Sequence, residues 1–268
     1  FANRSETLSL QKIYTMNEAY VKSEISGHTC VIEFFHPQSN SLPGAILTKI
    51  AQEITAAGLD PKAKSILLKS GGDRAFCAGA SFDELMAINS KEEGLEFFSG
   101  FAKVINAIRV CPKFVIGRLQ GKTVGGGVGL ASAVDYCFAT KHSALKLSEL
   151  AVGIGPFVVG PAVERKAGKS AFVEMSIDAS EWRSATWGEA KGLYNKVFDD
   201  VESMDLYIEA FTGRIEKYSP EAMSELKSVF WRGTEDWDTL LMDRAKISGR
   251  LVLSDFTRNA INAFKTKS

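Results

Sequence analysis

Hydrophobic and polar residues follow two different spacings along the first part of the chain. Residues 20–25 and 29–35 are rich in β-branched and aromatic side chains and flank Gly27, which predicts a β-hairpin with the glycine in its turn. Ser41, followed by a proline in what would be the first helical turn, predicts the cap of a helix that runs to Gly58. A strand pair followed by a helix is therefore the first expected unit.

Further units of the same kind follow. Residues 92–109 carry apolar side chains at helical spacing, which predicts a long amphipathic helix. Short apolar runs predict further strands at 65–69, 114–119, 134–139 and 144–147. These elements indicate an α/β core of repeated strand-strand-helix units.

The last part of the chain has a different pattern, because strand signals fade after about residue 160. Apolar residues at helical spacing predict helices within 206–218, 222–230 and 237–245. We therefore divide the chain into an α/β core at 16–200 and a helical region at 201–268, whose aromatic surface packs either on another subunit or back on the core. Residues 1–15 lack the apolar stretch of a secretory signal and are expected to be a non-native or disordered extension.

Composition narrows the class of function. The 32 Lys and Arg residues balance the 32 Asp and Glu residues without a basic cluster, so no nucleic-acid partner is expected. The longest uncharged run, Phe34–Thr48, is short and contains two prolines, so no membrane span is expected. The four cysteines form no CxxC pair and only three histidines are present, which predicts reduced thiols in a cytoplasmic protein and no metal site.

The most unusual stretch is Gly121–Asp135, which reads GKTVGGGVGLASAVD. Glycine costs a helix or strand about 0.5–1 kcal/mol relative to alanine, so this clustering needs a cause. A dinucleotide-binding motif fails because its third glycine is Leu130, and a P-loop before Lys169 fails because its upstream glycine is Val163. A tight turn with close helix packing stays open, as does an elbow whose free helix N–H groups face a ligand.

A second run of small residues favours the elbow. Residues Gly72–Met86 read GDRAFCAGASFDELM and again join a strand to a helical pattern. Two such elbows, each presenting a backbone N–H group, are what a two-donor oxyanion hole requires. The pair is therefore more specific than either run alone.

Three motifs together resemble the enoyl-CoA hydratase/isomerase (crotonase) family: RAFCAGASFDEL, QGKTVGGGVGLASAVDYCFAT and KLSELAVGIGP. The resemblance runs from about Val21 to Lys267. It implies a spiral of ββα units with a C-terminal helical oligomerisation region that forms homotrimers or dimers of trimers. It also implies an acyl-CoA substrate and no cofactor other than the CoA of that substrate.

The resemblance implies roles for particular residues. The N–H groups of Ala80 and Gly126 would hold the thioester oxygen, and backbone around Phe76 and Ala78 would face the adenine. The segment that reaches the CoA of a neighbouring subunit would contain the C-terminal residues Phe264 and Lys267, although a solvated tail is the alternative for the lysine.

The family resemblance also bears on which carboxylates could act as acid and base. Two-glutamate hydratases carry a glutamate where this chain has Gly129, and their second glutamate matches Glu149, which is therefore the expected acid/base. One carboxylate can move a proton between two carbons, which isomerises a double bond, whereas adding water is easier with two groups. Single-glutamate members resemble Δ3,Δ2-enoyl-CoA isomerases in this respect, and hydration of branched acyl-CoAs stays open. The alternative for Glu149 is a surface or helix-capping acid.

Other positions depart from the pattern of the family. Phe157 places a ring where the family often has glycine near the acyl pocket, and Ser81 replaces an aspartate. Asp83 and Glu84 could supply the missing acid or could form a solvated helix face. Asp135 matches an aspartate that we expect to be structural and to bond backbone.

The leading hypothesis is an enzyme that hydrates or isomerises an enoyl-CoA through an enolate, with Glu149 as acid/base. A thioester hydrolase or C–C cleaving enzyme on the same scaffold is one alternative. A non-catalytic binding protein that keeps the fold, such as a scaffold or RNA-binding descendant, is the other. The sequence leaves acyl chain length and trimer versus hexamer open.

Overall fold

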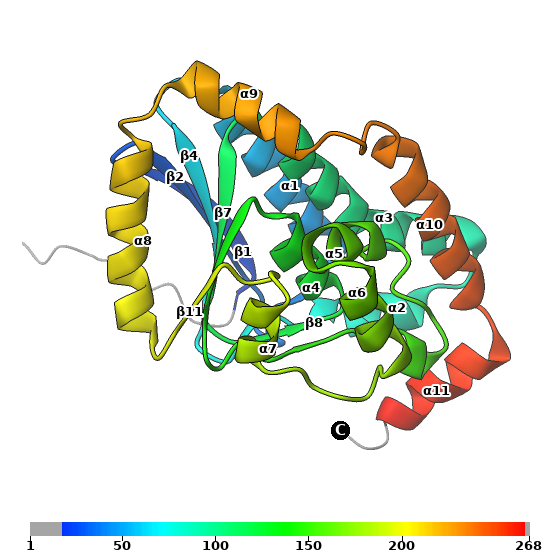
Figure 1. Cartoon of the computed structure of the whole chain (residues 1–268). Helices are drawn as coiled ribbons and strands as arrows, with labels where there is room; N and C mark the ends of the chain where they lie inside the picture. The colour runs from blue at the N-terminus through cyan, green and yellow to red at the C-terminus, as the bar shows by residue number, and fades with distance from the viewer. Residues whose placement is uncertain (1–17, 266–268) are drawn as a thin grey trace, which may run out of the picture.

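The computed structural model describes residues 18–265. The hairpin is confirmed: β1 and β2 pair antiparallel, and Gly27 lies in their turn with a φ of 59°. A six-stranded sheet continues from it, with parallel pairing beyond β2 (Figure 1). Its strands in spatial order are β1 (Tyr20–Ser26), β2 (Thr29–Phe35), β4 (Ser65–Ser70), β7 (Phe114–Leu119), β9 (Tyr136–Thr140) and β11 (Lys196–Phe198).

Two small parallel sheets lie beside the main one and carry the elbow segments. One has the order β10 (Leu145–Lys146), β8 (Lys122–Val124) and β5 (Ala75–Cys77). The other pairs β3 (Ser41–Leu42) with β6 (Gly79–Ala80). Residues far apart in the sequence therefore meet at the edge where the site is expected.

Helices surround the sheets (Figure 1). Those of the core are α1 (Gly44–Leu59), α2 (Phe82–Ala87), α3 (Lys91–Val110), α4 (Gly126–Ala133), the 3₁₀ turn η1 (Leu150–Val152), α5 (Gly160–Ala167), α6 (Lys169–Ile177) and α7 (Ala185–Ala190). Those of the C-terminal region are α8 (Val201–Ile215), α9 (Pro220–Phe230), α10 (Trp237–Leu251) and α11 (Asp255–Lys265). None of the described helices is long and apolar enough to cross a membrane.

The central strands β4, β7 and β9 are buried on both faces, which explains their nearly continuous apolar runs, whereas the edge strand β1 is largely exposed. Successive residues of β7 show this: Val115 joins the core formed with α1 and α3, whereas Ile116 joins a second cluster formed with α8. Figure 1 shows α8 on the side of the sheet away from α1. Because side chains alternate along β7, the core helices α1 and α3 pack on one face of the sheet and α8 packs on the other.

One expectation about helices is wrong. Ser41 does not cap α1, because it lies in β3 and its hydroxyl donates to the Ala80 carbonyl at 2.8 Å. The N–H of Gly44, the first residue of α1, instead donates to the Glu84 carboxylate at 2.8 Å. The C-terminal region also contains a helix beyond the three predicted ones, α11; its Ile261 is buried, whereas its Phe256 is 68% exposed.

Candidate active site

The two elbows lie side by side. Gly125 precedes α4 with a φ of 52° and a ψ of −116°, a conformation that essentially only glycine adopts. Gly126 is the first residue of α4, so its N–H has no acceptor within the helix. A Cβ added to Gly79 would lie 3.4 Å from the Val124 oxygen and 3.9 Å from the Gly126 nitrogen. The segment containing Ala80 therefore runs directly beside the start of α4.

Close packing also requires the glycines, so the tight-packing interpretation is confirmed. A Cβ on Gly126 would lie 2.2 Å from the ring of Phe101, and one on Gly127 would lie 2.6 Å from the carbonyl oxygen of Cys77. Side chains at these positions would displace α3 or the β5 segment. The run combines one conformational requirement, at Gly125, with several steric ones.

A cavity of about 550 Å³ opens in front of the two elbows. Ala80 and Gly126 line it, and its walls are largely apolar, with aromatic rings from α2 and α3 and from the loop after η1. Those rings belong to Phe82, Phe97, Phe98, Phe101 and Phe157. The cavity thus suits an uncharged, apolar group bound with its polar end at the elbows.

Glu149 carries the only carboxylate that lines this cavity among the described residues. It directly precedes η1, and its Oε1 would lie 3.0 Å from a Cβ added to Gly125. The residue as a whole is half-buried, but its Oε2 is enclosed and has no hydrogen-bond partner in the part of the chain that the structure describes. Burial in these apolar surroundings raises the pKa of Glu149 from 4.5 to about 7. An acid with this pKa can both accept and return a proton near neutral pH.

The space beside Gly129 is filled. A Cβ on Gly129 would lie 2.4 Å from Cγ1 of Val159 and 2.7 Å from its Cβ. Val159 is buried and also lines the cavity. A carboxylate at position 129 would therefore require Val159 to move or shrink.

The other acidic candidates have structural contacts. Glu84 caps α1, and Asp83 accepts a hydrogen bond from the Gln38 side chain at 3.0 Å; neither lines the cavity. Asp135 accepts from the backbone N–H of Val115 at 2.7 Å, as expected of a structural residue, and pairs with the buried Lys227 at 2.8 Å. None of these carboxylates replaces an acid at position 129.

Only some of the residues expected to bind the acyl-CoA line the cavity. Ala78 and Phe157 line the cavity, whereas the Phe76 side chain is fully buried and packs edge-to-face on Phe34, away from the cavity. The Phe76 side chain is therefore a core residue, and only its backbone remains a candidate for contact with adenine. Phe264 lies in α11 but its side chain, like the whole of Lys267, is outside the described residues.

Sequence patterns did not identify the aromatic and basic group at the mouth of the cavity. A second cavity of about 400 Å³ shares Ala78 and Val124 with the first, and Trp182 lies at their junction. Lys122 and Lys146 approach the Trp182 ring, with nitrogen-to-centroid distances of 5.2 and 4.7 Å, and Arg74 also lines the second cavity. Two cations beside an aromatic ring, with a third lining the adjoining cavity, suit a ligand with anionic groups and a planar base.

A signal for part of this group was present in the sequence. Arg74 and Lys122 stand at the starts of the two strands that lead to the elbows, and Ala75 pairs with Lys122 in the parallel register of β5 and β8. Trp182, by contrast, comes from an irregular loop before α7 and had no such signal. Among the described residues, no group of three His, Cys, Asp or Glu side chains is arranged to hold a metal ion.

Comparison with known proteins identifies the family of this chain. The sequence profile of the enoyl-CoA hydratase/isomerase family matches residues 24–265. The chain belongs to this family. A solved structure of enoyl-CoA hydratase from Bacillus halodurans superposes with a TM-score of 0.84 over 91% of this chain and 99% of that one, at 17% identity. The crotonase-like α/β fold implied by the resemblance is thus confirmed.

Relatives of this family member differ in activity. The short-chain-enoyl-CoA hydratase of Clostridium acetobutylicum is 26% identical over 91% of this chain and 94% of its own. The peroxisomal Delta(3,5)-Delta(2,4)-dienoyl-CoA isomerase of Arabidopsis thaliana is 27% identical over 74% of this chain and 76% of its own. The mitochondrial 3-hydroxyisobutyryl-CoA hydrolase of Bos taurus is 32% identical, but the match covers 58% of this chain and 42% of that protein. Similarity alone therefore does not select one reaction.

Proposed function

We propose that the protein converts 2- or 3-enoyl-CoA thioesters through an enolate, and that double-bond isomerisation is its principal reaction. The observation that carries this proposal is Glu149: within residues 18–265 it is the only carboxylate that lines the apolar cavity beside the start of α4, and its enclosed Oε2 has no hydrogen-bond partner there. A single group with a pKa of about 7 is suited to moving one proton.

The proposed mechanism uses the two elbows and one carboxylate. The thioester oxygen accepts hydrogen bonds from the N–H groups of Ala80 and Gly126, which stabilise the negative charge that develops on it. Glu149 removes a proton from the α or γ carbon of the acyl chain, and the electrons move into the thioester to form the enolate. The protonated Glu149 then returns the proton to the other carbon, so the double bond moves and no atom is gained or lost.

Hydration is the second candidate. Among the described residues, Ser148, Ser180 and Ser248 line the cavity, and a serine hydroxyl is a suitable partner for a water molecule. The names of the hydratase relatives support this alternative. Thioester hydrolysis or C–C cleavage on the same enolate scaffold is a third, and the hydrolase relatives support the former. The retained Glu149 argues against a non-catalytic binding protein.

Product analysis separates these reactions. The protein is incubated with a panel of 2-enoyl- and 3-enoyl-CoAs, and the products are followed by mass and by NMR. Conversion of 3-enoyl to 2-enoyl thioester without a change of mass supports isomerisation. Gain of one water by 2-enoyl substrates supports hydration, and release of free CoA supports hydrolysis. If no acyl-CoA binds or reacts, the proposal fails and a non-catalytic role is favoured.

The pH dependence of turnover is a first prediction. Glu149 must be unprotonated to act as the base, and its pKa is about 7. We therefore expect kcat/KM to fall about tenfold per pH unit below that pKa and to level off above it. The measurement is a profile of kcat/KM between pH 5 and 9. A profile that is flat between pH 5 and 8 would contradict the role of Glu149.

Removal of single cations at the cavity mouth is a second prediction. If Arg74 and Lys122 pair with the phosphates of CoA, alanine at either position should raise KM for acyl-CoA about fivefold, since an exposed charge pair contributes about 1 kcal/mol. KM for the corresponding acyl-pantetheine, which lacks the nucleotide, should not change. Lys191→Ala is the matched control, because Lys191 also lies over a tryptophan, Trp187, but away from both cavities. Equal effects on the two substrates would rule out recognition of the nucleotide.

We also propose assembly into a homotrimer or a dimer of trimers, as the family resemblance implies. Exposed apolar side chains on and after α8 and α9 support it, since an unassembled protein would leave them in water. They are Leu206, Tyr218, Leu226, Val229 and Phe230.

A further inference from the structure

Two buried side-chain amides converge on one carbonyl just before the first elbow. Asn40 is 2% exposed and Gln120 is 4% exposed. Nδ2 of Asn40 donates to the Ala75 oxygen at 2.9 Å, and Nε2 of Gln120 donates to the same oxygen at 3.2 Å. The Ser70 hydroxyl adds a longer contact at 3.4 Å. A carbonyl held by this many donors has little freedom to turn.

Asn40 also holds the other side of β5. Its backbone oxygen accepts from the N–H of Ala78 at 3.1 Å, and its Nδ2 additionally donates to the Gly71 oxygen at 2.9 Å. Its Oδ1 accepts from the N–H of His36 at 2.7 Å, which fixes the orientation of the amide. One residue thus fixes the backbone both where β5 begins and immediately after it ends.

The residues after Asn40 continue this support as far as Ala80. The Ser41 hydroxyl donates to the Ala80 oxygen, and the Leu42 oxygen accepts from the N–H of Ser81 at 3.0 Å. Segment 40–42 therefore borders the first elbow along its whole length. Because Ala80 supplies one proposed oxyanion donor, the position of that donor depends on this segment.

The backbone at this point is strained. Ser39 and Asn40 have φ values of 55° and 57°, and within residues 18–265 they are the only non-glycine residues with positive φ. Such conformations persist where surrounding contacts over-determine them, and they cluster at functional sites. Asparagine adopts this conformation more readily than most residues, so its side chain and its backbone both suit the position.

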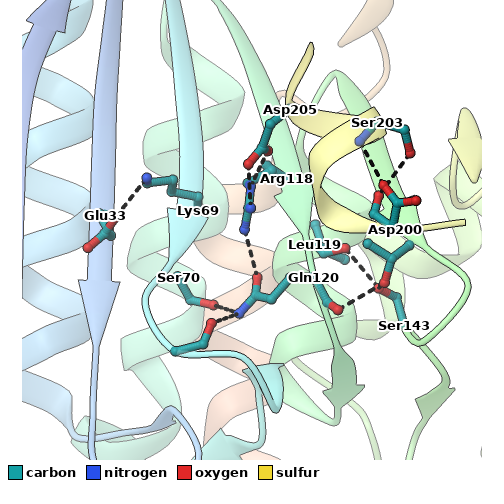
Figure 2. A network of polar contacts seen from close by, with 12 residues as sticks. Glu33, Lys69, Ser70, Arg118, Leu119, Gln120, Ser143, Asp200, Ser203 and Asp205 are labelled. Atoms are coloured by element: carbon teal, nitrogen blue, oxygen red, sulfur yellow. Dashed lines mark hydrogen bonds and ion pairs between the residues drawn. The ribbon is translucent and has the colours of Figure 1, made fainter. Parts of the chain in front are cut away.

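Gln120 is itself held from the opposite side. Figure 2 shows its amide between Ser70 and Arg118; Nε2 donates to the Ser70 hydroxyl at 2.9 Å and Oε1 accepts from Arg118 at 3.4 Å. Arg118 in turn makes two hydrogen bonds to Asp205 of α8, at 2.7 and 2.8 Å. With Oε1 held on this side, Nε2 of Gln120 faces the Ser70 hydroxyl, the Gly72 oxygen at 3.1 Å and the Ala75 oxygen.

We propose that Asn40 is a positioning residue for the thioester-binding N–H of Ala80, with Gln120 as its partner on the Ala75 carbonyl. This inference rests on the proposed function, because it assigns a role in presenting one of the two oxyanion donors. Donors act on the transition state only while they are held at hydrogen-bond distance from the developing charge. Small displacements of positioning groups are costly to rate for this reason.

Asn40→Asp, Gln120→Met and the control Trp231→Phe form the test set. Asn40→Asp keeps an oxygen for the His36 N–H and a residue type that tolerates positive φ, but it removes both Nδ2 donations. Gln120→Met keeps the length of the side chain and removes its donors. Trp231→Phe removes a remote hydrogen bond to Asp135, so it reports the effect of a general loss of stability.

The readouts are kcat and KM, the melting temperature, and the infrared carbonyl frequency of bound butyryl-CoA, a saturated thioester that lacks the reactive double bond. We expect Asn40→Asp to lower kcat about tenfold or more with KM within about twofold, and Gln120→Met to act in the same direction. The thioester carbonyl should shift less from its frequency in solution in both variants. Trp231→Phe should lower the melting temperature while kcat and the carbonyl frequency stay as in the unaltered protein.

Two other results have distinct meanings. An unaltered kcat and carbonyl frequency in Asn40→Asp, or changes in Trp231→Phe of equal size, would overturn the positioning role while leaving the proposed function in place. Failure of the unaltered protein to bind butyryl-CoA or to convert any enoyl-CoA would reject the proposed function first and the positioning role with it.

Discussion

Replacement of Glu149 by Gln is expected to abolish turnover and to stabilise the fold. Glutamine keeps the shape of the side chain but cannot take or return a proton, and loss of a positioned acid/base typically costs about 10²- to 10⁴-fold in rate. KM should change little, because the thioester oxygen is bound by backbone N–H groups. The rate is measured on the substrate that the enoyl-CoA panel identifies.

The gain in stability follows from the raised pKa of Glu149. In the unfolded chain this carboxyl titrates near 4.5, and in the folded protein near 7. Between these values the folded state binds the proton more strongly, so the contribution of Glu149 to stability falls as the pH rises and is lowest above pH 7. The difference corresponds to about 3 kcal/mol of free energy of unfolding. Glu149→Gln should therefore raise the free energy of unfolding by most of this amount at pH 8 and by little at pH 4.5.

Chemical unfolding of the two proteins at several pH values measures the effect. Glu209→Gln serves as the matched control, because it makes the same change of charge at an exposed position on α8. We expect the control to change neither the rate nor the pH dependence of stability. Full activity of Glu149→Gln, or a stability difference that does not depend on pH, would contradict the assignment.

Introduction of a glutamate at Gly129 is expected to destabilise the protein by about 4 kcal/mol or more, because it combines overpacking with an unpaired buried carboxylate. Its Cβ would overlap Val159, which lies 2.4 Å from that point. Gly129→Ala should show only the steric part of the effect. The midpoint of urea unfolding gives the comparison.

A double mutant with Val159 tests whether steric overlap causes the destabilisation by Gly129→Glu. If overlap with Val159 is responsible, Val159→Gly in the Gly129→Glu background should recover part of the stability, although Val159→Gly alone creates a cavity and destabilises. Additive effects of the two substitutions, or a Gly129→Glu variant as stable as the unaltered protein, would contradict the close approach of α4 and Val159.

Much of the fold was predictable from local patterns. The hairpin around Gly27, the strand at 65–70 and the long helix α3 follow from spacings that act within a few residues. The two elbows were also visible, because glycine and alanine are required wherever backbones approach closely. Glu149 stood out mainly through the family resemblance; it lies after β10 and directly before η1.

The parts that were missed depend on contacts between distant residues. Ser41 has the sequence signature of a helix cap, but α1 is capped by Glu84, forty positions later. Asn40 ends the turn at residues 37–40 and directly precedes β3, and its amide reaches Gly71 and Ala75. Helix α11 packs on the turn that carries Glu149, since Phe256 and Thr257 fill the space beside Gly153. No local pattern encodes such pairings.

Exchange of α protons tests the central claim most directly, because it isolates enolate formation from the choice between isomerisation and hydration. Butyryl-CoA is incubated with the protein in D₂O, and loss of its α-proton signal is followed by NMR. The account predicts exchange that is catalysed by the unaltered protein and is lost in Glu149→Gln. Binding of butyryl-CoA without any α-proton exchange would contradict it.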